Sequence, residues 1–160
     1  AATGSRSLQF TDAAGLEHSF APYMYYQPHL RAGVARGRFD IRLRQGVAFY
    51  HEWRDSHRPY RAGPSVAFDG EGTISAHGDP LLQVPLDTWV TLEITCPLGK
   101  QANGQFDLTV TVAGEQPRHF DGLPCSHGRF NRIDWFGFVS NTDGPSVAFV
   151  DNIALETTAE

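Results

Sequence analysis

Arginine residues gather in one quarter of this 160-residue chain, where they could hold an anionic ligand. Eight of the twelve arginines lie between residues 31 and 61, together with only three acidic residues, so this window carries a net charge of +5. The whole chain carries −5, so the remaining residues carry −10. A guanidinium group binds a carboxylate or a sulfate through two parallel hydrogen bonds, which a lysine cannot do. The window therefore predicts either a solvated basic surface or a binding face for an acidic ligand.

The strand pattern predicts how these side chains are grouped. Residues 38–44 alternate between polar and apolar side chains, and residues 47–54 continue the alternation after a Gln45-Gly46 turn. A three-residue loop with a left-handed glycine would join the two strands as a hairpin and pair Leu43 with Val47. One face of this hairpin is apolar and is predicted to be buried, with Phe39 opposite His51 and Ile41 opposite Phe49. The opposite face presents the candidate ligand-binding residues Arg38, Asp40, Arg42, Tyr50, Glu52 and Arg54, with Arg38 opposite Glu52 and Asp40 opposite Tyr50.

Aromatic residues near the hairpin are further candidates for contact with a ligand. Trp53 is on the core side in this register, so it either packs in the core or stacks on a sugar ring where the strand end opens into a binding rim. Tyr60 lies in the same basic window. Other aromatic residues that could serve in the same way are Tyr23, Tyr25, Tyr26 and Trp135, of which Tyr25 and Tyr26 are predicted to lie in a loop.

Alternation of polar and apolar residues dominates the whole chain, and no stretch has a helical period. Further strands are predicted at residues 8–10, 64–69, 73–77, 89–95, 106–112, 133–140 and 146–155. Segment 133–140 is apolar on both faces, which predicts a buried central strand. About nine short strands, punctuated by turn residues, predict one all-β domain over residues 1–160, built as a two-sheet antiparallel β-sandwich.

Composition and motifs exclude several classes of function. No apolar run approaches the ~20 residues that a membrane span needs, and the N-terminus has no signal-peptide pattern. The net charge of −5 does not suit a general nucleic-acid binder. The sequence has no Gly-x-Ser-x-Gly string and no zinc pattern. The only cysteines, Cys96 and Cys125, fit either a disulfide or two buried free thiols.

The order of the segments resembles the concanavalin A-like lectin/glucanase superfamily of laminin-G-like jelly rolls. The strings that carry this resemblance are GRFDIRL, VAFYHEWRD, GPSVAF, ISAHG, WVTLEIT, FDLTVTV and the closing FVDNIAL. The resemblance implies two curved antiparallel sheets, with ligands on the concave face or at the rim loops. Its members include lectins, carbohydrate-binding modules, glycoside hydrolases and polysaccharide lyases, so the fold does not choose among them. Calcium is common in the superfamily, which makes Asn141, Asp143 and Asp151 candidate ligands, although the residues themselves predict no metal or other cofactor.

The residues favour binding over catalysis. The Glu-x-Asp-x-x-Glu strand of the superfamily's glucanases is absent, and Asp40 and Glu52 each have a predicted partner. A lyase needs a cation, a base and often a tyrosine, and the arginine face supplies these types with Tyr50, Tyr60, His51 and His57 nearby. Residues 60–63 also resemble a short alginate lyase motif, but the companion Arg-Thr-Glu-Leu and Gln-Ile-His strings are absent.

We therefore expect a non-catalytic carbohydrate-binding domain with a preference for acidic glycans. It would be one module of a larger extracellular or periplasmic protein that processes polysaccharide. A polysaccharide lyase acting on a uronate polymer is the first alternative. A structural or interaction module that packs against a neighbouring domain is the second, and it would expose an apolar patch where the partner docks.

Overall fold

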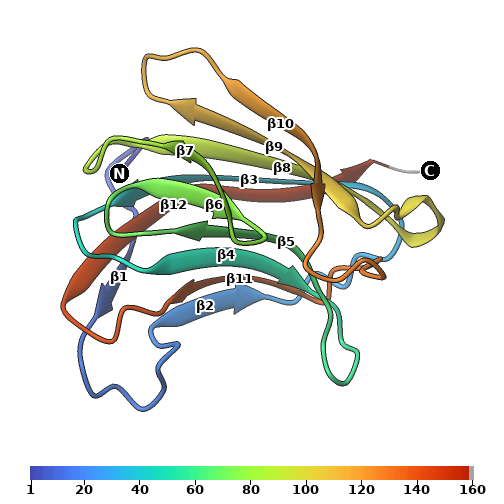
Figure 1. The fold of residues 1–160 in the computed structure, drawn as a ribbon, viewed down its shortest axis with the longest axis horizontal. Coiled ribbons are helices and arrows are strands. Elements are labelled where there is room, and N and C mark those ends of the chain that lie inside the picture. Colours follow the sequence, from blue (N-terminus) through green and yellow to red (C-terminus); the bar gives the residue numbers. More distant parts are fainter. Residues whose placement is uncertain (159–160) are drawn as a thin grey trace.

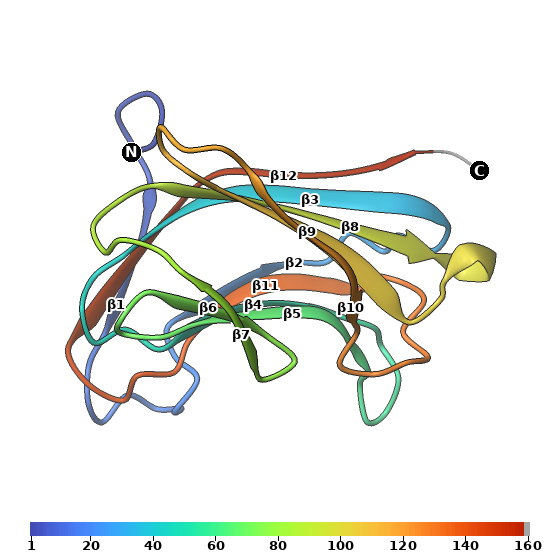
Figure 2. The same cartoon turned by 45° about the horizontal axis from the view of Figure 1, so that its top comes forward.

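The computed structural model describes residues 1–158, which form two antiparallel six-stranded sheets packed face to face (Figure 1). Sheet A has the strand order β1-β12-β3-β8-β9-β10, and sheet B has the order β2-β11-β4-β5-β6-β7. In Figure 2, the central strands of sheet A (β12, β3, β8 and β9) lie above those of sheet B (β11, β4 and β5). The all-β sandwich predicted from the alternation is confirmed. Among the described residues, no helix is long and apolar enough to cross a membrane.

The strands are short, apart from two long ones in the middle of sheet A. Sheet A contains β1 (Leu8–Asp12), β3 (Gly33–Leu43), β8 (Val90–Leu98), β9 (Gln105–Val112), β10 (Arg118–Pro124) and β12 (Ser146–Thr158). Sheet B contains β2 (Tyr23–Tyr26), β4 (Phe49–Arg54), β5 (Ala62–Phe68), β6 (Thr73–Ala76), β7 (Asp79–Gln83) and β11 (Trp135–Ser140). A single 3-10 turn, Gly99–Gln101, is the only helical element of the described chain.

The core lies between the sheets and is rich in aromatic rings. Phe39 of β3 meets Phe138 of β11 edge-on, with ring centroids 5.0 Å apart. Phe10 of β1 meets Phe49 of β4 in the same way, also at 5.0 Å. Such pairs add about 0.5–1.5 kcal/mol each to the free energy gained from burying their area. These contacts join sheet A to sheet B, so they fix which face of each strand points outward.

The predicted hairpin between residues 38–44 and 47–54 is wrong. β3 pairs with β12 and β8 in sheet A, whereas β4 pairs with β11 and β5 in sheet B. Residues 44–48 therefore carry the chain from one sheet to the other. Phe39 and His51 do meet, with ring centroids 4.6 Å apart, but across the core. Alternation identifies the buried face of a strand, and two strands facing each other across a sandwich have the same pattern as two strands side by side.

Three strands were not predicted, and each lies at the edge of a sheet or next to a tight turn. β2 and β7 are the two edges of sheet B, and β10 is an edge of sheet A. Most of their residues are exposed on both faces, so the alternation that reveals a half-buried strand is missing. Tyr25 and Tyr26 thus belong to strand β2, and their predicted loop position is wrong. Segment 133–140 is correctly predicted as an internal strand, because β11 lies between β2 and β4.

The two cysteines are free, buried thiols in the structure. Cys96 lies on β8, and its Sγ is 3.6 Å from the carbonyl oxygen of Gln105. The neighbouring Cys125 thiol, together with burial, raises the pKa of Cys96 above its usual value. Of the two sequence alternatives, the structure therefore has the pair of neighbouring thiols.

Candidate functional site

The predicted ligand-binding face is divided between the two sheets. Because β3 and β4 do not pair, their outward side chains point to opposite sides of the molecule. Arg38, Asp40 and Arg42 are on the outer face of sheet A, and Tyr50, Glu52 and Arg54 are on the outer face of sheet B. The predicted contacts between Arg38 and Glu52 and between Asp40 and Tyr50 are therefore wrong.

On sheet A, the predicted residues are bound to their neighbours. The Asp40 carboxylate is buried and accepts hydrogen bonds from Thr91 Oγ1 and Asn152 Nδ2, both at 2.5 Å. Arg38 has its Nε 3.9 Å from a carboxylate oxygen of Glu93, and both side chains are about half exposed. Such an exposed pair contributes at most about 1 kcal/mol. These contacts tie β3 to β8 and β12 and leave no shared pocket with β4.

Arg42, the third of these residues, is held between aromatic rings. Its guanidinium carbon is 4.4 Å from the ring centroid of Phe149 and 5.3 Å from that of Trp89. The rings cover the guanidinium and anchor the side chain by cation–π attraction. Arg42 therefore stabilises the outer face of sheet A by packing.

Trp53 packs in the core, which decides between the two alternatives for this residue. Its side chain is fully buried, and the indole Nε1 donates a hydrogen bond to Nε2 of His51 at 2.8 Å. His51 Nδ1 lies 2.8 Å from the carbonyl oxygen of Gly137, so Nδ1 carries the proton and donates to that oxygen. Burial lowers the pKa of His51 to about 3. A neutral, buried His51 cannot contact a ligand.

The outer face of sheet B brings the remaining candidates together around Arg54. Arg54 is the register partner of Trp135 across the β4–β11 ladder, so their side chains lie next to each other. The guanidinium carbon is 4.1 Å from the Trp135 ring centroid and 4.5 Å from that of Tyr60. Arg54 also donates from Nε to Glu52 and from Nη2 to the Tyr50 hydroxyl, at 3.4 Å. Five side chains from two strands and a loop thus form one cluster.

Gly137 makes room for the Trp135 ring. In β11 the two residues point to the same face, and the indole lies over the glycine. A Cβ atom at position 137 would be 2.2 Å from the ring, which is far too close. The absence of a side chain at Gly137 therefore lets the indole lie along the sheet. The alternation of polar and apolar residues in this segment does not indicate that Gly137 makes room for the Trp135 ring.

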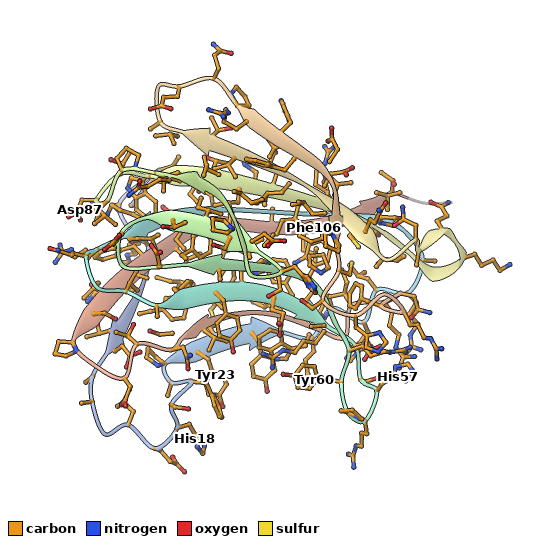
Figure 3. The ribbon with its side chains drawn as sticks, viewed as in Figure 1. His18, Tyr23, His57, Tyr60, Asp87 and Phe106 are labelled. Carbon is orange, nitrogen blue, oxygen red and sulfur yellow. The ribbon has the colours of Figure 1, made fainter. Side chains whose placement is uncertain are left out.

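Beside this cluster is a pocket of about 370 Å³, which we call the aromatic pocket. Its lining comes from β4, β11, β2 and two loops: Phe20, Tyr23, Tyr50, Arg54, Tyr60 and Trp135. In Figure 3, Tyr23 and Tyr60 lie on the same side of the molecule, in the lower half of the picture. Phe20 is the one lining aromatic residue that the sequence analysis did not single out. Tyr26, in contrast, turns toward an apolar groove at the sheet edge with Leu30 and Leu155.

A second, more polar pocket of about 280 Å³ adjoins the first. This polar pocket shares the Arg54, Tyr60 and Trp135 side chains with the aromatic pocket. Its other lining residues are Gln27, His29, Asp55, Ser56 and Asp134. Burial opposes ionisation of both aspartates, yet hydrogen bonds outweigh it, so the pKa of Asp55 and that of Asp134 are lowered. Both carboxylates are therefore ionised and bonded to the protein.

The aromatic pocket offers ring faces and hydrogen-bond donors to a ligand. Burial raises the pKa of the Tyr50 phenol, although the Arg54 charge acts in the opposite direction, so the phenol is protonated at neutral pH and can donate a hydrogen bond. Glu52 is paired with Arg54, so the pocket lacks the two free carboxyl groups that glycoside hydrolysis needs. Across residues 1–158, no group of three or more histidine, cysteine or acidic side chains could hold a metal ion.

Solved structures with the same architecture are numerous, although no family model and no curated protein matches the sequence. An endo-β-1,4-glucuronan lyase from the fungus Trichoderma reesei superposes with a TM-score of 0.66 at 10% identity, over 98% of this chain and 83% of that chain. The chain has the concanavalin A-like jelly-roll fold. A PL-14 alginate lyase from Aplysia kurodai gives a TM-score of 0.59 at 10% identity, over 98% of this chain and 84% of the other. The exoplasmic/lumenal domain of VIP36, bound to Ca²⁺ and Man3GlcNAc, gives a TM-score of 0.58 at 9% identity, over 98% of this chain and 81% of the other. At such low identity, this concanavalin A-like jelly roll shares a fold with these proteins, and its function must be argued from its own surface.

Proposed function

We propose that the outer face of sheet B is a non-catalytic carbohydrate-binding site with a preference for acidic glycans. The observation that carries the proposal is the position of Arg54, held between the rings of Trp135 and Tyr60 at the edge of the aromatic pocket. Aromatic faces pack against the C–H faces of sugar rings, and a planar guanidinium matches a carboxylate. One pocket offers both kinds of contact.

The similar folds add weight to a carbohydrate ligand. Two of the solved structures are named as lyases of glucuronan and alginate, and a third holds Man3GlcNAc. A protein that meets such polymers would act outside the cytoplasm, which agrees with the extracellular or periplasmic setting expected from the sequence.

The preference for acidic over neutral glycans should be modest. Glu52 neutralises part of the Arg54 charge, and Nε and Nη2 already donate to Glu52 and Tyr50, so Nη1 and the second hydrogen of Nη2 remain for a ligand. An ion pair at such a partly exposed site contributes on the order of 1 kcal/mol and is weakened by salt. Most of the binding free energy would therefore come from ring packing and hydrogen bonds to hydroxyl groups.

A polysaccharide lyase acting on a uronate polymer is the alternative, and the Tyr50–Arg54 pair favours it. In such β-elimination a base removes the C5 proton of the uronate, the C4–O bond breaks, a C4–C5 double bond forms and the leaving oxygen takes up a proton. Arg54 could neutralise the carboxylate, and Tyr50 could donate to the leaving oxygen. The base is the weak point, because the Tyr50 phenol is protonated and the described lining of the aromatic pocket includes no histidine; His29 lines only the adjoining polar pocket.

Titration calorimetry with polyuronates and neutral polysaccharides, at low and physiological salt, tests the binding proposal. We expect Tyr60→Ala and Trp135→Ala to weaken binding about tenfold or more, equivalent to ~1.4 kcal/mol. Arg38→Ala, on the opposite sheet, is the matched control and should bind like the wild type. Equal loss in all three variants, or no binding to any glycan, contradicts the proposal and favours the interaction-module alternative.

The lyase alternative has its own measurement. Incubation with a polyuronate and continuous ultraviolet recording would reveal the unsaturated product of β-elimination. A rise in absorbance that Tyr50→Phe abolishes would establish the lyase and overturn the non-catalytic proposal.

A further inference from the structure

The cluster around Arg54 is a shared wall between two pockets. Arg54, Tyr60 and Trp135 line both the aromatic pocket, of about 370 Å³, and the polar pocket, of about 280 Å³. A ligand that contacts Arg54 can therefore extend from it in two directions. A site for a single terminal sugar would need only one of these pockets.

On one side of Arg54, the wall continues as a row of aromatic rings. Trp135 is followed by Tyr25 with ring centroids 5.7 Å apart, and Tyr25 by Tyr23 at 6.2 Å. The row goes on from Tyr23 to Phe20 at 5.7 Å and from Phe20 to His18 at 4.8 Å. It crosses β11 and β2 and ends in the loop between β1 and β2, where Figure 3 shows His18.

The faces of these rings are only partly covered by one another. Three of the four neighbouring pairs are nearly parallel, with interplanar angles of 13°, 16° and 22°. Direct face-to-face contact would bring parallel rings to about 3.5–4.0 Å, so rings with centroids 4.8–6.2 Å apart are either offset or separated by a gap. Phe20, Tyr23 and Tyr25 are each more than 40% exposed. A contiguous exposed row of this kind marks a binding surface, whereas isolated exposed aromatic residues are ordinary.

On the other side of Arg54, the polar pocket offers hydrogen-bonding groups. Gln27 and Ser56 line it, and His29 has its Nδ1 3.3 Å from a carboxylate oxygen of Asp134. Arg132 donates to Ser56 Oγ at 2.8 Å, which fixes the orientation of this hydroxyl. Amide, hydroxyl and imidazole groups suit the hydroxyls of a sugar, and they differ from the ring faces on the opposite side.

We propose that the ligand is an extended acidic polysaccharide bound along its length, with an internal uronate at Arg54. This inference rests on the proposed carbohydrate-binding function of the same site. The units on one side of the uronate pack along Tyr25, Tyr23 and Phe20, and at least one unit on the other side occupies the polar pocket. The spacing of the rings is similar to the length of one pyranose unit, so each step of the row corresponds to about one sugar.

A chain-length series tests this inference. Oligoglucuronates of two, four and six units, with neutral β-1,4-linked oligosaccharides of the same lengths, would be titrated by calorimetry. We expect affinity for the acidic series to rise at least tenfold from the dimer to the hexamer. Phe20→Ala and Gln27→Ala, at opposite ends of the site, should each weaken hexamer binding about two- to tenfold, and by a larger factor than dimer binding. Leu16→Ala, an exposed apolar variant in the same loop as Phe20, is the control and should leave hexamer binding unchanged.

The outcomes separate this inference from the proposed function. Dimer and hexamer affinities that are equal, with neutral effects of Phe20→Ala and Gln27→Ala, would overturn the extended site and leave the carbohydrate-binding proposal standing. Equal affinities for the acidic and the neutral oligosaccharides at every length would overturn the assignment of an internal uronate to Arg54. The absence of binding at any length would overturn the proposed function and this inference with it.

Discussion

The indole of Trp135 lies over Gly137, its neighbour two residues further along the same face of β11, so closely that no other amino acid fits at position 137 without moving the ring. The same indole contacts the Arg54 guanidinium on the adjacent strand. A backbone position without a side chain thus controls the geometry of the proposed binding site.

Substitution of Gly137 by alanine should displace the Trp135 ring and separate it from Arg54. We expect Gly137→Ala to weaken glycan binding about tenfold, because both the ring face and the guanidinium lose their positions. The tryptophan fluorescence spectrum should change as well. Gly128→Ala is the matched control, since nothing lies within 4 Å of a Cβ atom at that position. Unchanged binding by Gly137→Ala would argue that the Trp135 orientation is irrelevant to the ligand.

Neutralisation of Glu52 should sharpen the preference for acidic glycans. Glu52→Gln keeps the size of the side chain and removes the charge that partly cancels Arg54. We expect affinity for polyuronates to rise about two- to fivefold at low salt, equivalent to ~0.4–1 kcal/mol, and affinity for neutral glycans to stay constant. The ratio of the two affinities is the measured quantity. Glu93→Gln, beside Arg38 on sheet A, is the comparison variant, and an equal gain there would mean that only net charge matters.

The buried His51 should make the protein less stable in mild acid. Its pKa is about 3 in the folded state and ordinarily about 6.5 in an unfolded chain, so between these values the unfolded chain binds a proton that the folded chain does not. The free energy of unfolding should therefore fall by up to ~1.4 kcal/mol per pH unit as the pH drops below 6.5. Urea unfolding at several pH values between 7 and 4.5 would measure how the free energy of unfolding depends on pH. This interval lies above the pH range in which most carboxylates titrate.

Two further observations check that the slope belongs to His51. His51→Gln should flatten the dependence on pH, because glutamine does not titrate. In the folded wild type, NMR titration should leave the His51 ring signals unshifted down to about pH 4.5. A His51 ring that titrates near 6.5 in the folded protein would rule out this account.

The two thiols should be unreactive in the folded protein. Cys96 and Cys125 are both buried, and the pKa of Cys96 is raised, so little thiolate is accessible for alkylation. We expect that, in protein purified with reductant, neither cysteine reacts appreciably with a thiol reagent in the folded state. Both cysteines should react in denaturant. Fast reaction of the folded protein would contradict the buried positions. A mass lower by two hydrogen atoms, with no reaction even in denaturant, would show that the pair forms a disulfide when oxidised.

The sequence reveals which residues face the core more reliably than which strands are neighbours. Phe39 and Phe49 are correctly predicted as buried, because alternation depends only on the local chain. The partners of β3 and β4 depend on how the loop at residues 44–48 turns, and a loop of this length can either cross the sandwich or close a hairpin. This single error divides the predicted binding face in two.

The candidate site could be predicted only in part for a related reason. Tyr50, Glu52, Arg54 and Tyr60 lie within eleven residues of one another, so their proximity is largely a local matter. Trp135 and Phe20 reach the same pocket from distant parts of the chain, through the pairing of β11 with β4 and β2. No spacing rule relates these positions, because long-range strand order is a property of the whole fold.

The order of strands in sheet B also governs when the protein becomes able to bind. The site joins residues near position 20, near position 54 and at position 135, so none of these segments can form it alone. Contacts between such distant parts of a chain form late and slowly in folding. During synthesis, Arg54 and Tyr60 leave the ribosome long before β11 arrives to place Trp135 beside them. A nascent chain therefore cannot bind the proposed ligand until the sandwich is nearly complete. After dilution from denaturant, the rate at which glycan binding recovers would report the rate of the last stage of folding.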